Sequence, residues 1–181
     1  FEEGHFLLTD PISKYLPEFS DMQVYIGEED GNIKTEPADP ITIQQLLLHT
    51  SGLTYDFFQH PVAKMYVENG VVSSPHQSGS PEGGMSAGTS SNLNIGQWTK
   101  LVADLPLVAQ PGTEWNYSIG MDVLGRLVEV ISGESYSDFL SERIFKPLGM
   151  VDTGFHVPDD KLRRFAANYV PSADGGIQLF D

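Results

Sequence analysis

The sequence contains no cysteine, which excludes disulfides, thiolate metal sites and cysteine nucleophiles. Basic residues are also scarce: Lys and Arg total 10 against 25 Asp and Glu, a formal net charge of −15. The acidic residues are spread along the chain, and such a surface repels the phosphates of nucleic acids. No apolar run approaches the ~20 residues that a membrane-spanning helix needs. We therefore expect no nucleic-acid partner and no membrane span, while the compartment and the oligomeric state stay open.

Two motifs for an acylated serine are absent as well. The elbow G-x-S-x-G has no match, and S-x-x-K, in which a lysine one helical turn away takes the serine proton, is also missing. The residues three positions before the lysines are Pro11, Gly31, Pro61, Gln97, Arg143 and Pro158. These residues alone therefore cannot assemble that acylation chemistry.

Metal and cofactor signatures are equally weak. The histidines are scattered, with no H-x-x-x-H pair, and no phosphate-binding or dinucleotide fingerprint occurs. They are His5, His49, His60, His76 and His156. We expect no metal site and no cofactor.

What the sequence does contain is mostly helical patterning with one early hairpin. Asp10 is a typical N-cap for a short helix, and Asp30-Gly31 is a typical hairpin tip. Thr42 with Gln45, and Asn94 with Gln97, are capping boxes for two helices. Residues 118–132 repeat apolar side chains at helical spacing, and Gly133 follows as a C-cap. Residues 69–92 are dense in Gly, Ser and Pro, which predicts a long loop.

Residues 111–125, PGTEWNYSIGMDVLG, join a turn to the start of a helix. Tyr117 at this junction is either a packing residue or a general base, and the second role requires nearby cations that depress its pKa. His49, which closes an apolar helix before Gly52, is either a base or a group that caps the last helical carbonyls. Residue type alone favours the structural reading of both.

The order of three motifs resembles a known family. HTSGL at 49–53, PG-x-x-W-x-YS from residue 111 and PLGM-x-x-T-x-F from residue 147 occur in that order. In this they resemble the serine β-lactamase-like family, which includes class C β-lactamases, D-alanyl-D-alanine carboxypeptidases and family VIII carboxylesterases. Residues 1–19 also resemble the stretch that follows the S-x-x-K helix of the family. The resemblance covers most of the chain, apart from the Gly/Ser-rich loop.

The resemblance implies a mechanism in which the serine of S-x-x-K is acylated by an ester or amide carbonyl. The lysine and the tyrosine of a Y-x-N motif manage the protons, and a late K-T-G or H-x-G strand edge helps to bind the substrate. By this likeness Tyr117 is the catalytic tyrosine. The segment after HTSGL borders the pocket, so Tyr55 and Phe57 are candidate contacts for an apolar acyl or alcohol group. Asp122, Trp115 and Gly125 are expected to be structural, and Met150 and Phe155 to be core residues.

One departure from the family pattern bears on the substrate. The third position of Y-x-N is Ile119, whereas lactamases and peptidases use that asparagine to hold the substrate amide. The sequence YSIGMDVLG resembles the esterase branch of the family more than the lactamase and peptidase branches. We therefore expect a small-molecule ester as substrate, with a β-lactamase or D-alanyl-D-alanine carboxypeptidase as one alternative. A non-catalytic binding or scaffold protein is the other.

The resemblance also implies an organisation for the chain. Residues 1–41 would be a helix and hairpin of the α/β domain, residues 42–160 a helical domain, and residues 161–181 the return to the α/β domain. We expect a mostly α segment of the two-domain fold. The resemblance implies that the serine and lysine precede Phe1 and that the late strand motif follows Asp181. Because the chain begins with Phe1 rather than methionine, we expect the absence of a signal peptide to say little.

Overall fold

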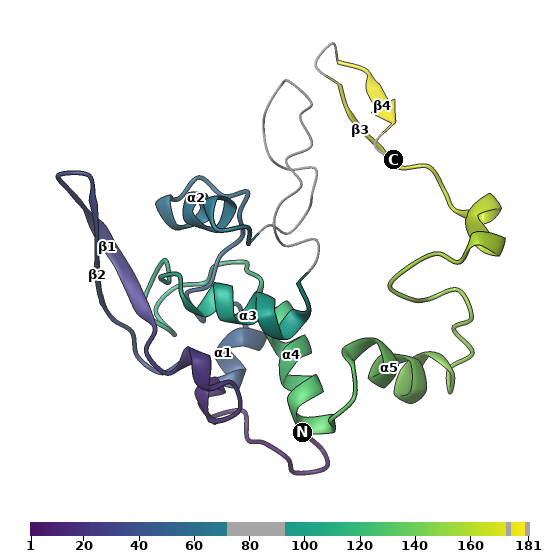
Figure 1. The fold of residues 1–181 in the computed structure, drawn as a ribbon, viewed down its shortest axis with the longest axis horizontal. Helices are drawn as coiled ribbons and strands as arrows, with labels where there is room; N and C mark the ends of the chain where they lie inside the picture. The colour runs from purple at the N-terminus through teal and green to yellow at the C-terminus, as the bar shows by residue number, and fades with distance from the viewer. Residues whose placement is uncertain (72–92, 173–174, 180–181) are drawn as a thin grey trace. The chain divides into compact units, whose positions relative to one another are not determined.

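The computed structural model describes residues 1–71, 93–172 and 175–179 (Figure 1). The predicted loop at 69–92 therefore falls outside the described residues from position 72 onward. Two compact units divide the chain, Phe1–Tyr136 and Ser137–Asp181. No helix among the described residues has the length and apolar character needed to cross a membrane.

The first unit opens with two 3-10 turns and the predicted hairpin. The turns are η1 (Ile12–Lys14) and η2 (Pro17–Phe19), and strands β1 (Gln23–Glu29) and β2 (Asn32–Pro37) pair antiparallel. Asp30 and Gly31, with φ of 53° and 76°, form the two-residue tip between the paired residues Glu29 and Asn32. Both tip residues have positive φ, the backbone of a turn that matches the twist of paired strands.

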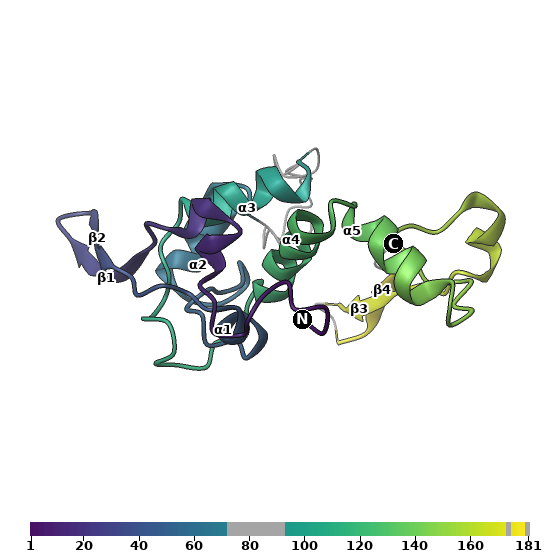
Figure 2. The ribbon, with the colours of Figure 1, turned by 90° about the horizontal axis from the view of Figure 1, so that it is seen from below.

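Four α-helices complete the part of this unit that the structure describes. They are α1 (Ile43–Leu47), α2 (Pro61–Glu68), α3 (Ile95–Ala103) and α4 (Gly120–Ser132). Both predicted capping boxes are present, with reciprocal bonds between Thr42 and Gln45 and between Asn94 and Gln97. Helix α4 packs against α1 and α3, which lie beside it in both views (Figures 1 and 2). It ends at Gly133, whose φ of 75° is the left-handed C-cap that the sequence predicts.

One hydrophobic core holds the first unit together. It draws apolar side chains from the 3-10 turns, β1 and all four helices, with Leu46, Tyr66 and Val123 fully buried. The segment 49–54 is then tied to residues 107–119 by main-chain bonds, among them Val108 N–H to the Gly52 carbonyl at 2.8 Å. This tie brings the HTSGL motif beside the start of α4.

The second unit begins within α5 (Tyr136–Leu140), whose first residue is the last residue of the first unit. The π-helical turn η4 (Ser141–Phe145) follows α5 directly. The 3-10 helix η5 (Asp159–Arg164) and the antiparallel strands β3 (Tyr169–Pro171) and β4 (Ile177–Leu179) follow. Met150 and Phe155 are 39% and 60% exposed, so their expected core positions are wrong for this unit. The reason is size, since so short a stretch encloses too little volume for a core of its own.

The division after Tyr136 differs in place from the divisions expected near residues 41 and 160. Those divisions are the domain boundaries that the family resemblance implies for a longer protein, and they stay a prediction.

Candidate functional site

Tyr117 lies at the last stretch of loop before α4, and its side chain is 47% exposed. The residues on its two sides are fixed: Asn116 donates its backbone N–H to the His49 carbonyl at 2.8 Å, and Ser118 is fully buried. Asn116 also donates its side-chain amide to the Leu53 carbonyl at 2.6 Å. The backbone thus holds the tyrosine ring out at the surface from two anchored neighbours.

Aromatic rings from two separate loops gather around Tyr117. The centroid of the Tyr55 ring lies 5.3 Å from that of Tyr117, and Phe57 stacks on Tyr55 at 4.9 Å and 17°. Trp115, on the same loop as Tyr117, lies 6.4 Å from it between ring centroids and is 69% exposed. Rings at these separations attract one another by about 0.5–1.5 kcal/mol a pair beyond area burial. The arrangement is a partly exposed aromatic surface in which the Tyr117 ring contacts both Tyr55 and Trp115.

His49, which follows the C-cap of α1, contacts this surface through its ring. Its ring centroid lies 4.7 Å from that of Tyr117, and its Nδ1 accepts the Ser118 backbone N–H at 3.2 Å. The Ser118 hydroxyl lies 3.3 Å from the same nitrogen. A nitrogen that accepts an amide proton carries none itself, so the proton of the neutral ring is on Nε2. The expectation that the His49 side chain caps helical carbonyls is therefore corrected: its side-chain bonds are to Ser118.

The backbone of His49 is strained. Its φ of 56° is in the left-handed region, where a side chain with a Cβ costs about 1–2 kcal/mol. Strain of this kind persists where surrounding contacts hold it, and it gathers at functional sites.

A carboxylate lies close to the tyrosines. Burial raises the pKa of Asp122, which sits in the first turn of α4. Burial also raises the pKa of Tyr55, and the negative charge of Asp122 raises it further. Tyr55 therefore stays a neutral hydroxyl at ordinary pH, suited to donate or accept a hydrogen bond beside Tyr117.

Ile119, the residue in place of the family asparagine, points into the core. It is only 2% exposed and belongs to the buried apolar cluster. Its N–H donates to the Thr54 carbonyl at 3.4 Å, which closes the link between the two loops. The position offers packing and no polar group to a ligand.

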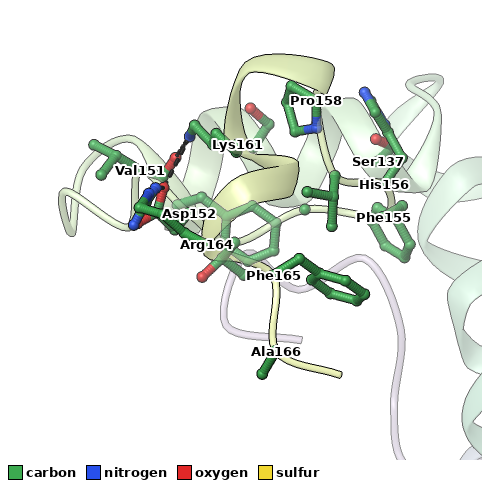
Figure 3. Close-up of a pocket in the computed structure, with 15 residues that line it drawn as sticks. Ser137, Val151, Asp152, Phe155, His156, Pro158, Lys161, Arg164, Phe165 and Ala166 are labelled. Atoms are coloured by element: carbon green, nitrogen blue, oxygen red, sulfur yellow. Dashed lines mark hydrogen bonds and ion pairs between the residues drawn. The ribbon is translucent and has the colours of Figure 1, made fainter. Parts of the chain in front are cut away.

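A separate cavity of about 600 Å³ lies within the second unit (Figure 3). Three charged side chains that line the cavity are paired with one another. Arg164 donates to both oxygens of Asp152 at 2.9 and 2.7 Å, and the Lys161 ammonium lies 2.9 Å from the same carboxylate. These bonds hold the pKa of Asp152 well below its usual range. The three residues thus form an ion-pair cluster that fastens η5 to the preceding turn.

No group of three or more metal-ligating His, Asp or Glu side chains comes together in the ranges 1–71, 93–172 and 175–179. Two such side chains lie near Tyr117. Burial raises the pKa of Asp122, and the ring nitrogen Nδ1 of His49 already accepts a hydrogen bond from Ser118. The groups that remain available to a ligand beside Tyr117 are tyrosine hydroxyls and aromatic rings.

The three residues that the resemblance named lie together, since Tyr117, Tyr55 and Phe57 form one chain of ring contacts. Sequence reasoning missed two neighbours. Trp115 was expected to be structural, yet it is mostly exposed beside Tyr117. His49 was expected to cap the end of a helix. The signal that could have indicated a place at the site was its position in the HTSGL motif.

Comparisons with known proteins identify a family and relatives of this chain. The family profile described as Beta-lactamase matches residues 1–178. The lovastatin esterase of Penicillium rubens is 31% identical over 97% of the chain, and the monacolin J acid methylbutanoyltransferase of Aspergillus terreus is 33% identical over 99%. The solved structure of EstCE1, a hydrolase with promiscuous acyltransferase activity, superposes with a TM-score of 0.74 at 28% identity over 99% of the chain.

The match is to a part of each relative. The chain spans 40% of the length of both curated relatives and 40% of the EstCE1 chain. Within that part the fold is β-lactamase-like, and the relatives include an esterase and an acyltransferase. The chain belongs to the Beta-lactamase family.

Proposed function

We propose that the intact protein is a serine carboxylesterase that works through an acyl-enzyme, with Tyr117 as its proton-handling tyrosine. The observation that carries the proposal is the setting of Tyr117, a half-exposed phenol between two anchored residues and beside an aromatic surface. The acylated serine and its lysine come from outside these 181 residues, because S-x-x-K is absent from the sequence and the relatives are longer.

The proposed reaction has two halves. The serine oxygen attacks the ester carbonyl while its proton passes to the lysine–tyrosine pair, and a tetrahedral intermediate forms. The bond to the alcohol oxygen then breaks, and Tyr117 returns the proton to the departing alcohol. In the second half water attacks the acyl carbonyl and gives a proton to the same lysine–tyrosine pair. The bond to the serine oxygen then breaks, the serine oxygen takes the proton back, and the carboxylic acid leaves.

The aromatic surface supports an apolar ester. Phe57 is 45% exposed and stacks on Tyr55, which in turn contacts Tyr117. An apolar acyl or alcohol group that lay on these rings would be held near the tyrosine hydroxyl, and its burial would contribute binding energy. Tyr55 and Phe57 are therefore the proposed substrate contacts.

Ile119 supports an ester over an amide. A β-lactamase or peptidase of this family needs a polar side chain at that position to hold the substrate amide. Here the position is apolar and buried, so it offers no hydrogen bond to a substrate. The lactamase and carboxypeptidase alternative lacks this support.

In the intact protein we place residues 42–160 in a mostly α-helical domain, and residues 1–41 and 161–181 in the α/β domain. The arrangement agrees with the helices α1 to α5 and with the hairpin that precedes them.

The test compares substrates on the intact protein. We expect hydrolysis of p-nitrophenyl butyrate that a serine-directed phosphonate blocks, with turnover of a chromogenic cephalosporin at least about a hundredfold slower. A cephalosporin rate equal to the ester rate would refute the esterase assignment. The absence of any turnover that the phosphonate blocks would instead favour a non-catalytic binding or scaffold protein.

Acyl transfer is a second candidate, favoured by the methylbutanoyltransferase among the relatives. An alcohol would then replace water in the second half of the reaction, and its proton would leave by the same route. Adding a primary alcohol to the ester assay distinguishes the two. A new ester in the products supports transfer, and the free acid alone supports hydrolysis.

A further inference from the structure

We propose that His49 is the positioning residue of Tyr117, holding the tyrosine in place through the two residues that flank it. The inference rests on the proposed function, because it gives His49 a part in the same reaction. It is carried by three contacts that one residue makes around Tyr117.

The first two contacts bracket the tyrosine. The main-chain carbonyl of His49 accepts the N–H of Asn116 at 2.8 Å, and its ring nitrogen Nδ1 accepts the N–H of Ser118 at 3.2 Å. Residues 116 and 118 are therefore both bonded to residue 49, one through its backbone and the other through its side chain. The backbone of Tyr117 between them has little freedom to move.

The third contact is made with the tyrosine ring itself. The His49 ring lies 4.7 Å from that of Tyr117 at an angle of 52°, and the side chain of His49 is half-buried. The imidazole therefore limits where the phenol can turn on that side. Tyr55 limits it on another, at 5.3 Å.

The turn at position 49 does not itself favour histidine. With φ at 56°, glycine or asparagine would fit the turn with less strain than histidine. Histidine supplies what glycine lacks there, an acceptor for Ser118 and a flat ring against Tyr117. Asparagine would keep the acceptor, since its Oδ1 occupies the place of Nδ1, but would lose the ring.

This difference gives a pair of variants that separate positioning from folding. His49→Gly relaxes the turn and removes the acceptor, while His49→Asn relaxes the turn and keeps it. In the intact protein we expect His49→Gly to lower kcat about tenfold to a hundredfold with little change in KM, as misplacement of a catalytic group does. His49→Asn should recover most of that loss.

His60→Gly is the matched control. The Nδ1 of His60 also accepts a backbone N–H, that of Val62 at 3.1 Å, and its ring pairs with Tyr25 rather than with Tyr117. The same substitution thus removes the same kind of bond elsewhere in the fold. We expect its kcat to stay within about twofold of the wild-type value, since glycine is tolerated at an N-cap.

A double-mutant cycle tests whether His49 acts through Tyr117. In a Tyr117→Phe background, His49→Gly should lower kcat by less than about threefold, because the hydroxyl that it positions is gone. A loss as large as in the wild-type background would overturn the proposal, as would wild-type kcat in His49→Gly alone. A near-normal rate for Tyr117→Phe would instead refute the proposed function itself.

A measurement on the unmutated protein tests the proposal even where the variants fold poorly. Nitrogen NMR of the histidine rings should show His49 with its proton on Nε2 and none on Nδ1, as the bond from Ser118 requires. A proton on Nδ1 in the neutral ring would overturn the proposal without any substitution.

Discussion

Gly52 offers a sharp test of how the HTSGL motif is held. Its φ is +81°, and a Cβ built on it would lie 2.2 Å from the backbone oxygen of Ala109 and 3.1 Å from the Leu107 Cβ. Real Cβ atoms do not approach a backbone oxygen so closely, so Gly52→Ala must push apart the two segments that meet here. The same shift threatens the bond from the Val108 N–H to the Gly52 carbonyl.

The magnitude follows from three costs. The left-handed backbone costs alanine about 1–2 kcal/mol, overpacking against fixed atoms about 1–3 kcal/mol, and the weakened hydrogen bond about 0.5–1.5 kcal/mol. We therefore expect Gly52→Ala to reduce the free energy of unfolding by roughly 3–6 kcal/mol. That is a large share of the ~5–15 kcal/mol that stabilises a typical protein.

Gly133→Ala is the matched control, because its φ of +75° is similar while no atom lies within 4 Å of the added Cβ. It should lose only the backbone cost of about 1–2 kcal/mol. Urea unfolding of the intact protein measures both, with the free energy taken from the midpoint and slope. Equal losses for the two variants would refute the close contact at Gly52.

Three further predictions address charge, substrate and the chain by itself. Bonds from the Leu7 N–H, Tyr15 and Lys14 lower the pKa of Asp10 from 3.8 to about 2, so its contribution to stability is present above pH 3.8 and is lost as the pH falls through 2. Urea midpoints should fall less between those pH values in Asp10→Asn than in the wild type, and an equal fall would contradict the prediction. Phe57→Ala should raise KM for p-nitrophenyl hexanoate about threefold to tenfold with kcat little changed, whereas Ile33→Ala, exposed on the hairpin, should alter neither. The 181-residue chain alone should hydrolyse p-nitrophenyl acetate no faster than background, and turnover blocked by a phosphonate would disprove this.

Local signals in the sequence predicted several elements correctly. The capping boxes at Thr42 and Asn94, the hairpin tip at Asp30-Gly31 and the C-cap at Gly133 all form as expected. Each depends on residues within four positions of one another, so the chemistry that fixes it is visible in a short stretch.

Other features were not predicted from the sequence because the residues that determine them are of an unusual type or lie outside the expected position. Helix α2 begins at Pro61, and its N-cap is His60, whose ring nitrogen replaces the usual capping hydroxyl or carboxylate. Asp10, expected as an N-cap, instead accepts from Leu7, Tyr15 and Lys14, because the turn at residues 12–14 begins after Pro11 and makes no side-chain cap.

The site was predictable only in part, and from family likeness rather than from pattern. Likeness named Tyr117, Tyr55 and Phe57, which the structure brings together. The bond between His49 and Ser118 joins residues 69 positions apart, and no local rule reports such a contact. The exposure of Trp115 likewise depends on the loop that carries it.

The role of Tyr117 is the central claim, and Tyr117→Phe in the intact protein tests it most directly. The phenylalanine ring keeps the contacts with His49 and Tyr55 and removes only the hydroxyl, so folding should be preserved. With p-nitrophenyl butyrate we expect kcat to fall about a hundredfold or more, as loss of a general acid–base group does, with an unchanged thermal midpoint. A kcat within about threefold of the wild-type value would contradict the account.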